Sequence, residues 1–147
     1  MPLETGPYVQ AATFCDTVIE DKSGALSLIR LVDRVTHTVH GPGAPAEMPE
    51  VHYPLKLVLM LKSGLARGRH ELKIVPELPS AELKQPFTTS VHFEGEERGQ
   101  NIIMDISFPF KMEGVHWFNV YLDDTLLTKV PLRVMYHRIV TGPPSEH

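Results

Sequence analysis

The sequence contains only one cysteine, Cys15, so no disulfide can form within the chain. Small secreted domains that rely on disulfides carry several cysteines, and this class is therefore excluded. The opening segment Met-Pro-Leu-Glu-Thr-Gly-Pro has neither a basic region nor an apolar stretch, so it does not resemble a signal peptide. We therefore expect a protein of a reducing compartment, most simply the cytoplasm.

Long apolar runs and an excess of positive charge are also missing. The longest unbroken apolar run is 57–61, far short of the roughly 20 residues that a membrane-spanning helix needs. Lys and Arg number 14 against 18 Asp and Glu, which gives a net charge of −4 with histidine neutral. An acidic balance disfavours non-specific binding to nucleic acid or to anionic membranes. We expect neither as a partner.

The length and composition are those of one ordinary globular domain. The chain has 147 residues, of which 42% are hydrophobic and 22% charged. At this size about two-thirds of the unfolded surface can be buried, so stability requires neither a disulfide nor a metal. Thirteen prolines and ten glycines indicate many short strands and turns. We predict a single domain over residues 9–140, with flexible tails at 1–8 and 141–147.

Alternation of apolar and polar residues predicts the fold class. Residues 55–62 place four leucines on one face, and residues 100–108 place Ile102 and its alternate neighbours inward. Two β-rich runs between Gly114 and Tyr136 flank Asp123-Asp124, a pattern typical of a tight hairpin. About eight strands at short spacing predict an all-β, antiparallel, immunoglobulin-like β-sandwich. Pro131 lies inside the last strand, so that strand is an edge or directs the Pro131 nitrogen outward at a bulge.

Several apolar side chains are predicted to point away from the core. Trp117 and Tyr121 alternate with inward positions, so they lie on an outer sheet face. Such a pair can form a sugar platform or a protein-binding hot spot, unless the loop 40–54 covers it. Val58 and Met60 also face away from the leucines of their strand. A second apolar face indicates either a covering element or an oligomer contact.

The eight histidines raise the possibility of a metal site. His40 and His52 bracket the loop 40–54 together with Glu47 and Glu50, and these four residues could converge across its neck. Zinc requires three or four such ligands. The simpler interpretation is a polar loop, and histidines within strands, such as His116, are better explained as cross-strand or sheet-rim residues. We predict no metal and no cofactor.

Residues with catalytic potential lie in positions that have simpler explanations. The acidic pair Asp123-Asp124 and the acidic set Glu94, Glu96 and Glu97 fall at predicted turns, where acids are common for conformational reasons. Cys15 lies in a strand, and nothing in the sequence places a histidine beside it, so we expect a small buried apolar side chain. We predict no catalytic residues.

Two segments resemble a bacterial family of small domains of unknown function. The first is Phe14-Cys15-Asp16 with the run 23–29, although Ala25 and Arg30 depart from the family pattern. The second is Gly-Val-His-Trp-Phe-Asn-Val-Tyr-Leu-Asp-Asp, which is similar to the closing hairpin of that family and of many immunoglobulin-like bacterial modules. The resemblance covers about half the chain and implies a β-sandwich in a bacterial protein. It implies no catalytic residues.

Three functional hypotheses follow. The first is a non-enzymatic interaction or scaffold module of a bacterial intracellular complex, which binds a protein partner or a second copy of itself. Its expected contact residues are Trp117, Tyr121, Val58 and Met60, together with the loop that contains His40 and His52. The second is a carbohydrate or small-molecule binding module that uses the same aromatic residues. The third is a metal-assisted hydrolase built on His40, Glu47, Glu50 and His52.

Overall fold

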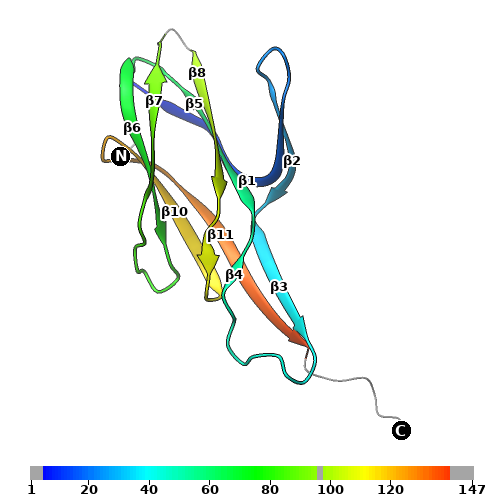
Figure 1. Ribbon diagram of the computed structural model, residues 1–147. Coiled ribbons are helices and arrows are strands. Elements are labelled where there is room, and N and C mark those ends of the chain that lie inside the picture. Colours follow the sequence, from blue (N-terminus) through cyan, green and yellow to red (C-terminus); the bar gives the residue numbers. More distant parts are fainter. Residues whose placement is uncertain (1–4, 96–97, 140–147) are drawn as a thin grey trace.

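A computed structural model describes residues 5–95 and 98–139 (Figure 1). The regular structure of this part of the chain is β-strand, and none of it is a helix long and apolar enough to cross a membrane. Of the predicted tails 1–8 and 141–147, residues 1–4 and 141–147 lie outside the described residues, as does the pair Glu96-Glu97; Pro7 is buried and Tyr8 begins the first strand. The described strands are β1 Tyr8–Glu20, β2 Leu26–Val32, β3 Arg34–His40, β4 Val51–His52, β5 Leu55–Lys62, β6 Gly68–Glu77, β7 Phe87–Phe93, β8 Gly99–Ile106, β9 Pro109–Phe110, β10 Gly114–Leu122 and β11 Thr125–Ile139.

The strands form two main sheets that pack face to face. One sheet has the order β2-β1-β5-β8, and the other has the order β3-β11-β10-β6-β7. This arrangement confirms the predicted β-sandwich. The described chain has more strands than the predicted eight, because the run 25–39 divides between the sheets and β4 pairs with β9 as a two-residue ladder. One pair, β3 with β11, is parallel and not antiparallel.

The core lies between the two sheets, where alternate side chains from each strand meet. Phe14 of β1 and Phe118 of β10 contact each other edge to face across this space, with ring centroids 5.0 Å apart. Each buried Leu, Ile or Phe contributes about 1.5–3 kcal/mol. The largest fully buried apolar side chains are Phe14, Phe93, Phe110, Phe118, Leu57, Leu59, Leu61, Leu72, Ile74, Ile106 and Leu132.

The hairpin between β10 and β11 has the predicted turn. Leu122 pairs with Thr125, which leaves Asp123 and Asp124 as a two-residue loop. Both aspartates have positive φ, 45° and 68°, as a type I′ turn requires. The Asp123 backbone N–H also donates to the carbonyl of Glu71 at 3.0 Å, which joins the turn to β6.

The surroundings of Pro131 show how β11 tolerates a proline. Pro131 pairs with Trp117 of β10, whereas the ladder with β3 includes β11 only from Arg133 onward. The Arg133 N–H donates toward the β3 side, to the carbonyl of Asp33 at 3.1 Å. Since alternate residues of a strand direct their nitrogens to the same edge, the Pro131 nitrogen points to that side before the β3 ladder begins. The strand is therefore an edge at Pro131, although not along its whole length.

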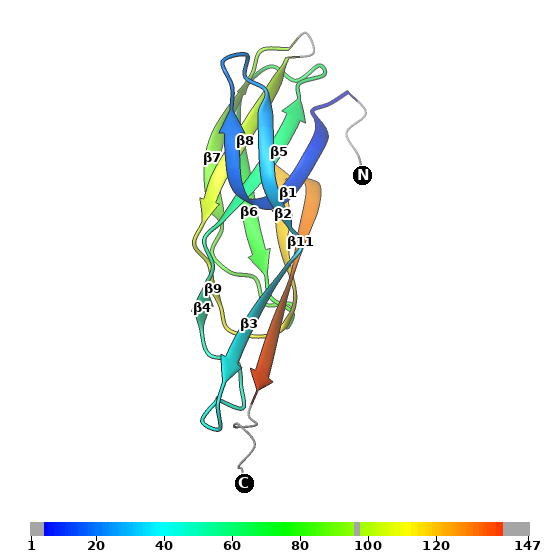
Figure 2. The same ribbon diagram turned by 90° about the vertical axis from the view of Figure 1, so that its right-hand side faces the viewer.

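Strand β1 extends beyond the sheet in which it begins. It pairs with β5 only as far as Cys15, and from Asp16 onward it pairs only with β2. We call this two-stranded hairpin, residues 16–31, the arm. Both views show the arm on the side of the four-stranded sheet that faces away from the five-stranded sheet (Figures 1 and 2).

Candidate functional site

Val58 does not belong to an accessible surface, contrary to its predicted role as a contact residue. It lies on the outer face of the four-stranded sheet, as its alternation with the leucines predicts, but its exposed fraction is 0%. Strand β5 lies between β1 and β8, and the arm lies over this side of the sheet (Figure 2). The burial of Val58 agrees with the predicted alternative in which another element covers this second apolar face. Met60, two residues along the same face, is half-buried.

Cys15 is fully buried at the point where the arm leaves the sheet. Its Sγ lies 3.6 Å from the carbonyl of Thr17. Burial raises the pKa of the thiol, and the nearby charge of Asp16 acts in the same direction. A thiol with a raised pKa is a poor nucleophile at neutral pH. The prediction of a small buried side chain at Cys15 is confirmed.

Trp117 and Tyr121 lie on the outer face of the five-stranded sheet, on alternate positions of β10. Both are half-buried. The Nζ atom of Lys129 is 5.0 Å from the centre of the Trp117 ring, and that of Lys73 is 5.7 Å from the centre of the Tyr121 ring. The side chains over the rings therefore come from the neighbouring strands β11 and β6, and the contacts are of the cation–π kind.

Asn119 lies between these two aromatic residues and is not among the site residues predicted from the sequence. It is only 4% exposed, although it occupies an outer-face position. Its Nδ2 donates to a carboxylate oxygen of Glu77 at 3.0 Å, while its Oδ1 has no hydrogen-bond partner within the protein. Its position could have been noticed from the sequence, because Asn119 is a polar residue between two aromatic residues on the same face of a strand.

His40 and His52 are both exposed, at the two ends of the long loop. His52 contacts Glu50, with Nε2 and Oε2 2.9 Å apart, and Lys111 lies 3.7 Å from the other oxygen of Glu50. The hydrogen bond from His52 is the main cause of a lowered Glu50 pKa. In the part of the chain that the structure describes, no three His, Cys, Asp or Glu side chains come together as a metal site. Of the four residues proposed for a metal-assisted hydrolase, Glu50 and His52 are in contact with each other.

His116 pairs with Leu132 of β11 as the cross-strand alternative predicts, but it is a core residue, so the sheet-rim alternative is wrong. It is 1% exposed and lies against the rings of Phe108 and Phe110, the latter at 5.1 Å between centroids. Burial lowers its pKa, because the charged imidazolium is poorly solvated there. Its Nδ1 is 3.4 Å from the carbonyl of Gly114, and its Nε2 has no partner within the protein.

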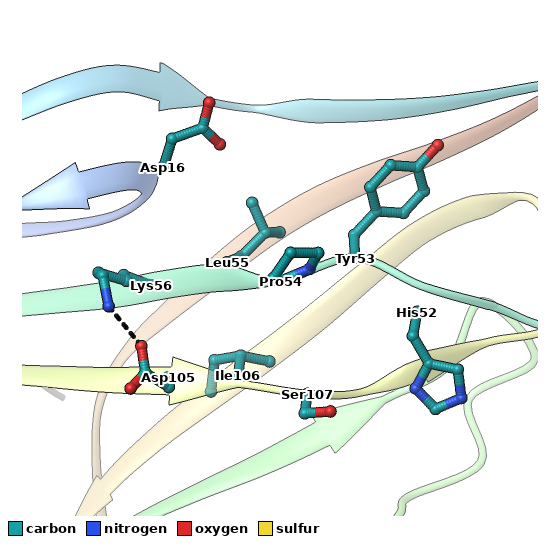
Figure 3. Close-up of a pocket in the computed structure, with 9 residues that line it drawn as sticks. All are labelled: Asp16, His52, Tyr53, Pro54, Leu55, Lys56, Asp105, Ile106 and Ser107. Atoms are coloured by element: carbon teal, nitrogen blue, oxygen red, sulfur yellow. Dashed lines mark hydrogen bonds and ion pairs between the residues drawn. The ribbon is translucent and has the colours of Figure 1, made fainter.

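A hollow of about 270 Å³ opens beside the base of the arm (Figure 3). The charges in its wall are paired: Lys56 contacts Asp105 at 2.6 Å, and Asp16 contacts Arg30 of the arm at 3.1 Å. Figure 3 shows Asp16 across the hollow from the Lys56–Asp105 pair. The residues that line the hollow are Asp16, His52, Tyr53, Pro54, Leu55, Lys56, Asp105, Ile106 and Ser107.

The arm carries the clearest exposed apolar surface of the described chain. On one face of its ribbon, Val18, Leu26 and Leu28 are half-buried. On the other face Ile19, Ile29 and Leu31 are 51%, 47% and 63% exposed. We call these three residues the arm patch. Ile29 pairs with Thr17 and Leu31 pairs with Cys15, so the patch runs along one side of the ribbon without a formal charge.

The turn at the tip of the arm is well defined. The Asp21 carboxylate accepts hydrogen bonds from the backbone N–H of Ser23 at 2.8 Å and of Ala25 at 3.2 Å, and it contacts the Ser23 hydroxyl. These bonds lower the pKa of Asp21, with the Ser23 hydroxyl as the largest cause. Gly24, with φ of 89°, completes the turn. The arm patch is thus held on an ordered hairpin. It is not among the surfaces predicted from the sequence, although apolar residues on both faces of one ribbon are a signal of such a surface.

Known proteins that resemble this chain include a sequence family and a solved structure. The family model described as a family of unknown function, DUF6941, matches residues 10–135. A solved structure of an immunoglobulin-like protein from Pseudomonas aeruginosa is similar at 14% sequence identity and a TM-score of 0.44. The likeness covers 88% of this chain and 96% of that one. The comparison with curated proteins yielded no match.

Proposed function

We infer the role of this chain from its surface, because the chain belongs to DUF6941, a family of unknown function. We propose a non-enzymatic protein-interaction module of a bacterial intracellular complex. The observation that carries the proposal is the arm patch, in which Ile19, Ile29 and Leu31 are about half exposed or more on a hairpin that extends beyond its sheet.

The physical basis is the free energy of covering apolar surface. A two-stranded ribbon is marginal in water unless another element covers it. The arm has a half-buried face that contains Val18 and Leu28 and an open face that contains the arm patch. Clustered exposed apolar side chains are typical of a protein interface. Covering the patch would contribute about 25 cal/mol for each Å² of apolar surface removed from water.

The test replaces the patch without touching the core. In the variant Ile29→Ser/Leu31→Ser we expect loss of partner capture from a bacterial extract and loss of self-association by sedimentation velocity. The thermal midpoint should change little, because both side chains are already exposed in the isolated chain. The variant Leu83→Ser is the matched control, since Leu83 is 62% exposed and lies in another part of the molecule. If the variant Ile29→Ser/Leu31→Ser associates as strongly as the Leu83→Ser control, the arm patch is excluded as the contact surface.

A second candidate function is binding of a carbohydrate or small molecule at the Trp117–Tyr121 face. It is supported by the half-buried rings of Trp117 and Tyr121 on one sheet face, with the Asn119–Glu77 hydrogen bond beside them. Aromatic rings beside amide and carboxylate groups suit sugar recognition. Trp117 is the sole tryptophan, so its fluorescence reports on this face alone. Quenching or a shift of its emission by a panel of neutral oligosaccharides supports binding, and an unchanged spectrum at high sugar concentration opposes it.

The location in a bacterial cytoplasm stays a prediction from the single cysteine and the sequence resemblance. So does the expectation that the partner is protein and not nucleic acid or membrane.

A further inference from the structure

Strands β3 and β11 end as a two-stranded ribbon at the end of the molecule away from the tip of the arm (Figures 1 and 2). Strand β11 pairs with β10 only as far as Val134, whereas its parallel ladder with β3 continues to Ile139. The Tyr136 hydroxyl donates to the carbonyl of Pro45 at 2.7 Å, and the Tyr136 ring stacks on His37. The loop after β3 therefore packs against the face of the ribbon that carries Tyr136.

The opposite face of the ribbon is basic. Four of the alternate positions that point away from the core carry exposed basic side chains. These residues are Arg34 and His40 of β3 and Arg133 and His137 of β11, and we call them the basic face. The ladder pairs Arg34 with Arg133, so the two arginines lie side by side on strands about 5 Å apart. From Arg34 to His40 the basic face extends over about 20 Å.

The charges of the basic face are not balanced within the described part of the chain. Strands β3 and β11 contain no Asp or Glu, and none of the ion pairs between described residues includes Arg34 or Arg133. The Glu113 carboxylate reaches β11 but accepts its hydrogen bond from the Tyr136 N–H, at 3.0 Å. Asp33 contacts Arg133 through backbone atoms. Positive charge is thus concentrated on one ribbon of a chain whose net charge is −4.

The Arg34–Arg133 pair opposes the stability of the sheet. Two like charges on neighbouring strands repel each other, and both side chains lie on the surface, outside the core. A partner with negative charge would remove this repulsion. Each guanidinium can donate two parallel hydrogen bonds to one carboxylate, which is the strongest contact that an exposed arginine makes.

We propose that the basic face binds an extended acidic segment of a protein partner. An extended segment presents the side chains of one face about every 7 Å, the same repeat as the alternate residues of β3 and β11. Alternate Asp or Glu residues can therefore meet the Arg34–Arg133 pair and His137 in succession. The hydroxyls of Thr36 and Thr38, exposed on the same face, add hydrogen-bond donors between the charges. This surface is separate from the arm patch, and the inference does not depend on that patch.

The number of charges favours a protein segment over a nucleic acid. A nucleic acid strand carries one phosphate every few ångströms, whereas the basic face has two arginines along its length. The net charge of −4 also opposes the approach of a long polyanion. Met135, which lies between Arg133 and His137 on the same face, is 37% exposed. It offers an apolar contact that suits a side chain of a peptide better than a phosphate backbone.

The test measures binding of a synthetic peptide to the full chain. The probe is a fluorescein-labelled peptide of alternating Glu and Ser, about eight residues long, which spans the basic face when extended. Fluorescence anisotropy at low salt should show saturable binding that weakens as salt is added. In Arg34→Gln/Arg133→Gln the affinity should fall about tenfold, because two charge-assisted contacts are lost. The matched control Arg69→Gln/Arg98→Gln removes the same charge from exposed arginines elsewhere and should bind like the native chain.

Thermal unfolding separates a binding role of the two arginines from a structural one. The variant Arg34→Gln/Arg133→Gln should unfold at the same temperature as the native chain or at a higher one, because the substitution removes a like-charge pair. A lower midpoint would show that the arginines stabilise the fold and would overturn the proposal.

Three binding results would also overturn the proposal. These are a native chain that does not bind the peptide, binding that the Arg34→Gln/Arg133→Gln substitution leaves unchanged, and an equal loss in the Arg69→Gln/Arg98→Gln control. A single-stranded oligonucleotide of equal charge that binds more tightly than the peptide would assign the surface to nucleic acid instead. The variant Ile29→Ser/Leu31→Ser should bind the peptide like the native chain, so the outcomes for the two surfaces stay distinguishable.

Discussion

His70 of β6 donates a hydrogen bond from Nδ1 to the carboxylate of Asp123, in the turn between β10 and β11. Its other ring nitrogen, Nε2, lies 2.8 Å from the carbonyl oxygen of Arg67. Because both partners are acceptors, the ring satisfies both only as the doubly protonated imidazolium. The bond to Asp123 is the largest cause of a raised His70 pKa, and burial opposes it. Asp123 also accepts from the Glu71 N–H, which is the first cause of its own lowered pKa.

The His70–Asp123 contact predicts a pH-dependent contribution to stability. A His pKa raised by folding stabilises the native state fully below the unfolded value of about 6.5, and this contribution is lost as pH rises through the folded value. The variant His70→Gln should therefore lose about 1 kcal/mol relative to the native chain at pH 6 and less at pH 9. Urea unfolding at both pH values measures the difference. An equal loss at both would contradict an imidazolium at this position.

His116 predicts the opposite pH dependence. Its pKa is lowered by burial, so the unfolded chain binds the proton more readily than the folded one. The native chain should therefore lose stability as pH falls below about 6.5, until the folded pKa is reached. In His116→Phe the aromatic contacts with Phe108 and Phe110 remain possible without a titrating group. The stability of the variant relative to the native chain should be higher at pH 5 than at pH 7.5, and a difference independent of pH would count against the buried neutral imidazole.

The edge-to-face contact of Phe14 with Phe118 joins the two sheets. Phe118 is 0% exposed and Phe14 1%. The variant Phe118→Ala removes this contact and leaves a cavity, so it should lower the free energy of unfolding by about 3–5 kcal/mol. Chemical denaturation measures this loss. A loss below about 1 kcal/mol would show that the ring is not part of the core.

Val58 tests whether the outer side of the four-stranded sheet is a second buried layer. Complete burial predicts that Val58→Ala costs about 2 kcal/mol of stability. Ile103→Ala, on β8 directly opposite Val58 in the register and 39% exposed, is the matched comparison and should cost less. Thermal and urea unfolding of both variants provide the measurement. If Val58→Ala were tolerated as well as Ile103→Ala, the arm would not exclude water from this face.

The Asp123-Asp124 turn offers a stabilising substitution. Asp124 has φ of 68°, a conformation that glycine adopts without steric cost. The variant Asp124→Gly creates the Asp-Gly pair preferred in type I′ turns and should raise stability by about 0.5–1 kcal/mol. The native contact of Asp124 with Lys73, which this variant removes, is largely exposed and contributes little to stability. A fall in the thermal midpoint would indicate that the Lys73 contact matters more than the turn conformation.

Much of the fold followed from local patterns. The period-two alternation of residues 55–62 places Leu57 in the core, and the acidic pair between two β-rich runs identifies the β10–β11 turn. Pro131 indicated an edge, which the structure confirms for the section before the β3 ladder begins. These features depend on neighbours within a few residues, where backbone geometry and side-chain direction are set by the chain itself.

The candidate site followed much less from the sequence. Alternation correctly places Val58 and Trp117 on outer faces, but it contains no information on what lies over them. Burial of Val58 depends on the side to which the arm bends after Cys15, and the half-burial of Trp117 depends on Lys129 of the adjacent strand. His116 became a core residue because Phe108 and Phe110 pack against it.

The amino-acid sequence alone determined a single β domain with an alternating core and a tight acidic hairpin, because those properties arise from the two-residue repeat of a strand and the φ preferences of a turn. Only the tertiary structure decided which outer positions meet water, since that depends on strand order and on contacts between residues far apart in the chain. The exposed faces of Ile29 and Leu31, and with them the proposed interface, belong to this second category.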